Sequence, residues 1–127
     1  MPPQKPPRRD RKQPVDLGRA LVEAWLTNER VKQVLLDLLE PAIWRRPPPC
    51  AQRKTIATTF AHIHNVRCMR LKMSAKAAPA RLDRGEATPE EVREALAASA
   101  RAMAALVERQ LLLWEWDKRW QEVAAGG

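Results

Sequence analysis

The segment TPEEVREALAAS, residues Thr88–Ser99, contains the clearest helix start in this 127-residue chain. Thr88 is a suitable N-cap, Pro89 fits the first helical position, and Glu91 is spaced to complete a capping box. One face then continues at the helical period through Val92, Leu96, Ser99, Met103, Leu106 and Gln110. The pattern predicts a single long helix from Thr88 to about Val123.

Two further helices are predicted upstream of this segment. The first begins at Asp16, a plausible N-cap, and ends near Glu40, ahead of the proline run at 47–49. Its expected inner stripe is Leu17, Leu21, Ala24, Trp25, Asn28, Leu35, Leu38 and Leu39. The second begins near Thr55 and ends near Ala77, and its expected stripe is Ile56, Phe60, Ile63, Val66 and Met73. No strand pattern competes, so we expect an all-α up-down bundle of three long helices.

The composition favours one helical domain. The chain has a mass of 14.5 kDa, only 4 glycines, 1 phenylalanine and no tyrosine. We expect a bundle over residues 15–123, a basic, proline-rich and disordered tail over 1–14, and a frayed end over 124–127. No apolar run approaches the roughly 20 residues that span a bilayer. Cys50 and Cys68 form no CxxC pair, so we expect free thiols and a cytoplasmic protein without membrane partners.

The chain is strongly basic, with a formal net charge of +8. Much of the excess lies in the tail 1–14, where one acidic residue, Asp10, faces Lys5, Arg8, Arg9, Arg11 and Lys12. Such a tail attracts nucleic acid weakly and without sequence preference. The alternative is a leader that only increases solubility.

Both histidines of the chain lie in the predicted second helix, at His62 and His64. Imidazole is a common metal ligand and proton carrier near neutral pH. Residues two apart on a helix point to different faces, so these two histidines do not chelate one metal together. Cys68 follows His64 by four positions and shares its face, which allows a Cys–His pair but requires a third, orienting group.

Arg67 lies on the apolar stripe of the same predicted helix. A buried guanidinium needs partners, because leaving it unpaired costs several kcal/mol. In an antiparallel bundle, Asn28 and Ser99 lie at a similar height on the other two helices. We therefore predict a polar layer of Asn28, Arg67 and Ser99. The alternative is that Arg67 extends along its methylene groups to the rim of the bundle.

The run TIATTFAHIHNVR, residues 55–67, resembles the second helix of the DinB/YfiT-like (damage-inducible) proteins. Residues 25–30, 79–84 and 88–99 resemble the same group, so the resemblance covers roughly residues 15–109. It implies a four-helix bundle, often dimeric, that holds zinc or nickel with three histidines. Known activities in this family are those of metal-dependent hydrolases and thiol-dependent transferases.

The resemblance assigns one metal ligand to His62, but the other two family ligands have no counterpart. They belong to a His-x-x-x-His pair on the last helix, and no histidine follows Arg109 in this chain. We therefore expect an incomplete or weak site for the divalent metal. Three helices that lack a fourth expose an apolar strip, which favours a homodimer.

Three functions remain open from the sequence. The first is a DinB-like binding or scaffold protein with little metal, and the second is a metal-dependent enzyme completed by a partner chain. The third is a small basic nucleic-acid-binding or partner-binding module without catalysis.

Overall fold

The computed structural model describes residues 16–49 and 54–126, with the side chains of 114–119 excepted. These residues form three long helices, α1 (Leu17–Leu38), α2 (Ile56–Ala75) and α3 (Pro89–Gly126), and one short 3-10 helix, η1 (Pro41–Ile43). No strand occurs in these ranges, so the predicted all-α helical bundle is confirmed. The tail 1–14 and Cys50 lie outside the described residues. None of the described helices is long and apolar enough to cross a membrane.

Each long helix starts at the residue that the sequence indicated. The carboxylate of Asp16 accepts a hydrogen bond from the Arg19 N–H at 3.0 Å. The hydroxyls of Thr55 and Thr88 accept bonds from backbone N–H groups three residues later, each at 3.1 Å. These bonds satisfy donors that have no partner within the first turn of a helix. The C-terminal ends differ by two or three residues from expectation, and α3 is helical through Gly126, where fraying was predicted.

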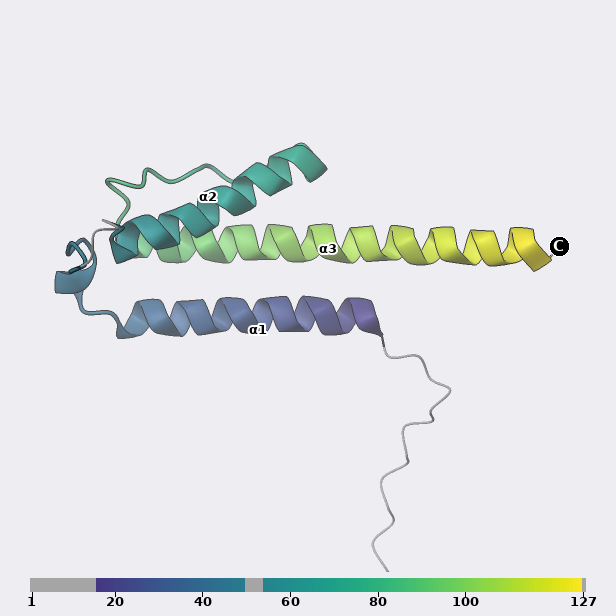
Figure 1. The fold of residues 1–127 in the computed structure, drawn as a ribbon, viewed down its shortest axis with the longest axis horizontal. Coiled ribbons are helices and arrows are strands. Elements are labelled where there is room, and N and C mark those ends of the chain that lie inside the picture. The colour runs from purple at the N-terminus through teal and green to yellow at the C-terminus, as the bar shows by residue number, and fades with distance from the viewer. Residues whose placement is uncertain (1–15, 50–53, 127) are drawn as a thin grey trace, which may run out of the picture.

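Helix α3 is the central element, and α1 and α2 both pack against it (Figure 1). Helix α1 runs antiparallel to α3: Trp25 Nε1 donates to the Ala100 carbonyl at 2.9 Å, and Gln33 Nε2 donates to the Arg93 carbonyl at 3.1 Å. Helix α2 runs in the same direction as α3, as the ribbon in Figure 1 shows. The strict up-down order that we predicted is therefore wrong for this last pair.

The connection over residues 76–88 explains this direction. It turns back at Lys76, which has the positive φ of 58°, and then follows α2 toward its start. Asn65 fixes the connection, because its side chain donates to the Leu82 carbonyl at 2.9 Å and accepts from the Leu82 N–H at 2.8 Å. Helix α3 therefore starts beside the first turn of α2 and not beside its end.

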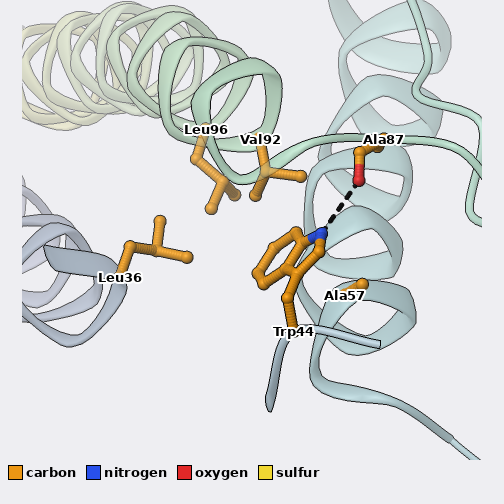
Figure 2. Packing of buried hydrophobic residues seen from close by; sticks show 6 residues of the cluster. All are labelled: Leu36, Trp44, Ala57, Ala87, Val92 and Leu96. Atoms are coloured by element: carbon orange, nitrogen blue, oxygen red, sulfur yellow. Dashed lines mark hydrogen bonds between the residues drawn. The ribbon is translucent and has the colours of Figure 1, made fainter. Parts of the chain in front are cut away.

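The hydrophobic core lies where the starts of α2 and α3 meet the end of α1. Figure 2 shows its buried residues, which are Leu36, Trp44, Ala57, Ala87, Val92 and Leu96. Trp44 is central: its indole Nε1 donates to the Ala87 carbonyl at 3.0 Å, and its ring stacks on Phe60 with centroids 6.3 Å apart. The indole thus joins the segment after α1 to α2 and to the residues just before α3.

The predicted stripe of α1 is the main correction to the expected packing. Most of its members are exposed, namely Leu17, Leu21, Ala24, Asn28, Leu35 and Leu38. The less exposed side of α1 contains Val22 and Trp25, which are partly buried, and Glu29 and Leu36, which are buried. On α2, Val66 and Met73 of the predicted stripe are also exposed, whereas a face of Ala57, Ala61, His64, Cys68 and Leu71 is buried. Periodicity located the helices but selected the wrong side of α1.

Candidate functional site

Arg67 is the centre of a buried polar layer that joins all three long helices. Its Nη2 donates to the Glu29 carboxylate of α1 at 2.7 Å, with the two side chains 6% and 8% exposed. Its Nη1 donates to the Leu96 carbonyl at 3.0 Å and to Ser99 Oγ at 3.2 Å, both on α3. The contact that we predicted between Arg67 and Ser99 is present, and the guanidinium does not extend to the rim.

Asn28 does not belong to this layer. Its side chain is exposed and accepts a hydrogen bond from Lys32, one turn later on the same helix. Glu29 takes the place that we assigned to Asn28, because a buried guanidinium is neutralised by a carboxylate and not by an amide. The sequence holds a signal for this: Glu29 follows Trp25 by four positions and precedes Leu36 by seven, so it shares their face.

The Glu29 carboxylate lies near two cations, Arg67 and Lys32. Burial lowers the pKa of the Lys32 ammonium, the positive charge of Arg67 lowers it further, and Glu29 opposes both effects. The Arg67 guanidinium also lies over the Trp25 ring, 4.8 Å from its centroid. Ser99 donates its proton to the Leu96 carbonyl and has no base beside it. The arrangement therefore clamps the helices together and supplies no nucleophile.

His62, the expected metal ligand, is exposed and pairs with an arginine. Nη2 of Arg84 lies 2.7 Å from His62 Nδ1, and because a guanidinium only donates, Nδ1 accepts. A zinc or nickel ion needs three or four nitrogen, sulfur or carboxylate ligands. Within residues 16–49 and 54–126, no three His, Cys, Asp or Glu side chains are placed to hold one. The donor set at His62, with a cation beside it, does not fit a divalent metal.

His64 and Cys68 lie together on the buried face of α2. His64 Nε2 is 2.8 Å from the Ala80 carbonyl and 3.2 Å from Cys68 Sγ, whereas the buried Nδ1 makes no hydrogen bond. Since a carbonyl only accepts, Nε2 carries the proton and cannot take one from the thiol. Burial raises the pKa of Cys68, against the opposing effects of Arg81 and Arg67. The pair therefore lacks the features of an activated cysteine.

The outward face of α1 is a second feature with potential function. We define the α1 outer face as ten positions: Leu17, Ala20, Leu21, Ala24, Thr27, Asn28, Val31, Val34, Leu35 and Leu38. Every one of them is exposed and none carries a charge, although 30% of the chain is charged. Part of the face is hollowed into a groove of about 320 Å³ along Thr27, Val31, Val34 and Leu35, with Arg30 at its border.

The chain matches no protein-family model, no curated protein and no solved structure. The polar layer, the surroundings of the two histidines and the α1 outer face are therefore the features of this molecule that bear on its function.

Proposed function

We propose that this protein is a non-catalytic helical assembly module that forms a homodimer through the α1 outer face. The observation that carries the proposal is the uninterrupted, uncharged and exposed surface along the whole of α1. Leu38, Leu17 and Val31 are 74%, 58% and 54% exposed. Monomeric proteins rarely leave a contiguous apolar surface of this kind in water, and such surfaces commonly mark interfaces.

The other residues of α1 support the same proposal. The charged side chains of the helix lie outside the face, at Arg19, Glu23, Glu29, Arg30, Lys32 and Asp37. Interfaces are depleted of charge at their centre and carry charge at their rim. A second copy presents an equally uncharged surface, so no charge loses water without a partner when the two faces meet.

Sedimentation velocity of the full chain tests the proposal. We expect the wild type to sediment as a dimer with twice the 14.5 kDa chain mass. Leu35→Lys, in the groove of the face, should give a monomer with unchanged helical circular dichroism. Leu112→Lys, at a leucine that is exposed on α3, is the matched control and should stay dimeric. The proposal is refuted if the wild type stays monomeric when the protein concentration is raised in 100-fold steps to the millimolar range.

A DinB-like metal enzyme is a second candidate, supported by the resemblance of residues 55–67 to that family. Elemental analysis of purified wild type beside His62→Ala separates it from the assembly module. Stoichiometric zinc or nickel that is lost in the variant would support the enzyme. A well-folded wild type without metal would refute the enzyme.

Weak nucleic-acid binding is a further candidate, supported by the net charge of +8 and the basic residues of the tail 1–14. Binding of duplex DNA should fall steeply with salt if the tail is responsible. Deletion of residues 1–14 should then abolish the binding, whereas binding that survives deletion would place the contact on the bundle.

A further inference from the structure

The outward positions of α1 follow the spacing of a coiled coil. Leu17, Leu21, Ala24, Asn28, Val31, Leu35 and Leu38 are separated alternately by four and three residues. This is the heptad pattern of a two-helix seam, in which Leu21, Asn28 and Leu35 occupy a positions and the others d positions. All seven side chains are exposed, so the seam has no partner within the described part of this chain.

Another side of α1 is already in contact with the other helices. Trp25, Glu29 and Leu36 bind or pack against the other helices, and their direction differs from that of the seam by about 110° on a helical wheel. The helix therefore forms before any second copy arrives, and pairing does not require the costly nucleation of a new helix. A seam of three heptads, short for a free peptide, is sufficient in this setting.

Asn28 is the one polar residue of the seam that offers both hydrogen-bond donors and an acceptor, and it lies near the middle. Burying its amide without a partner costs free energy. In a parallel, in-register pair the two copies of Asn28 meet in the same layer, where each can bond to the other. In an antiparallel pair, a positions face d positions, so Asn28 would meet Val31 or Ala24 and remain unpaired.

The flanking positions agree with the parallel arrangement. In a parallel coiled coil, a g residue lies beside the e residue five positions later in the partner helix. Here Thr27 would lie beside Lys32, and Val34 beside Leu39. No pair of like charges results, and Lys32 is free to move from Asn28 of its own helix toward solvent.

We infer that two copies of this chain pair through α1 in a parallel, in-register coiled coil, with Asn28 against Asn28 as the residue that sets orientation and register. This inference rests on the proposed function, because it requires that the α1 outer face forms the dimer. It adds the geometry of the pair and the residue that selects it.

Disulfide trapping of the full chain tests the geometry, in a background with Cys50→Ala and Cys68→Ala. Leu21→Cys and Leu38→Cys are prepared separately, then mixed, oxidised and mapped by mass spectrometry. A parallel pair gives disulfides only between two position-38 thiols or two position-21 thiols. Disulfides between position 21 and position 38 would overturn the parallel inference and leave the homodimer intact. A background protein that sediments as a monomer would overturn both.

Asn28→Val is the second variant, and it tests the role of the amide. Removing a buried polar group from the seam should tighten dimerisation about tenfold or more and admit oligomers larger than two. Glu23→Val, a change to valine at an exposed position of the same helix away from the seam, is the control and should leave the dimer dissociation constant unchanged. An Asn28→Val protein with the wild-type dissociation constant and only dimers would contradict the assigned role.

Discussion

Replacing Glu29 by glutamine tests the polar layer most directly, because it leaves the shape of the side chain and removes its charge. In the wild type the carboxylate accepts from Arg67 Nη2 at 2.7 Å in surroundings where both side chains are less than one-tenth exposed. The variant leaves the guanidinium buried and without its counter-charge. Arg67 retains the Leu96 carbonyl, Ser99 and the Trp25 ring as neutral partners.

The expected magnitude follows from these remaining contacts. Breaking a buried ion pair by removing one partner costs about 3–5 kcal/mol, and the neutral partners of Arg67 favour the lower end, about 3 kcal/mol. Total stabilities of small domains are about 5–15 kcal/mol. We therefore expect Glu29→Gln to lose a large fraction of the free energy of unfolding, with an unchanged far-ultraviolet spectrum at low temperature.

Urea denaturation followed by circular dichroism, at one fixed protein concentration, measures the effect. The matched control is Glu23→Gln on the same helix, which breaks the exposed pair with Arg19 and should cost less than about 1 kcal/mol. The double variant Glu29→Leu with Arg67→Met removes both charges and should be more stable than Glu29→Gln alone. A loss below 1 kcal/mol in Glu29→Gln, equal to the control, would refute the clamp.

Two further predictions concern α2. Asn65→Ala removes both hydrogen bonds to the backbone of Leu82, so we expect a loss of about 1–3 kcal/mol and faster amide exchange over residues 77–87; wild-type exchange there would contradict the fixing role. Because burial raises the pKa of Cys68 above its ordinary 9.0, the folded thiol contributes stability that is complete below pH 9.0 and lost as the pH rises through the folded pKa. Urea midpoints should therefore decline less above pH 9 in Cys68→Ala than in the wild type, and parallel declines in the two proteins would count against this assignment.

The helix starts could be predicted because capping is local chemistry. Asp16, Thr55 and Thr88 each accept a backbone N–H bond within three residues, and no distant part of the chain decides this. The direction of α3 could not be predicted in the same way. It depends on the connection after α2, which is held by two hydrogen bonds between Asn65 and Leu82, 17 positions later. Nothing in the periodicity of the sequence encodes that contact.

The residues of the candidate sites also divide into those that the sequence predicts and those that depend on tertiary contacts. Arg67 was recognisable because a charge on an apolar stripe demands partners, and Ser99 followed from its height in the bundle. Glu29 was missed because a charged residue on a helix is expected to face solvent when its partner on another helix is unknown. His62 was singled out by the resemblance to the DinB/YfiT-like proteins, whereas its position beside Arg84 is a tertiary feature.

The two errors on α1 have one physical origin. The helix has two faces that are periodic, one uncharged and one that mixes Trp25 and Leu36 with the ionised Glu29. In a single chain the more apolar face of a helix usually packs against the core, so we expected the uncharged face of α1 to be buried. The structure instead buries the mixed face, since Arg67 of α2 neutralises Glu29 and the indole of Trp25 covers the guanidinium. The most apolar face of α1 therefore stays exposed, while the charge of Glu29 is paired inside the bundle. Such an arrangement favours association, because a second copy gains the free energy of burying that face.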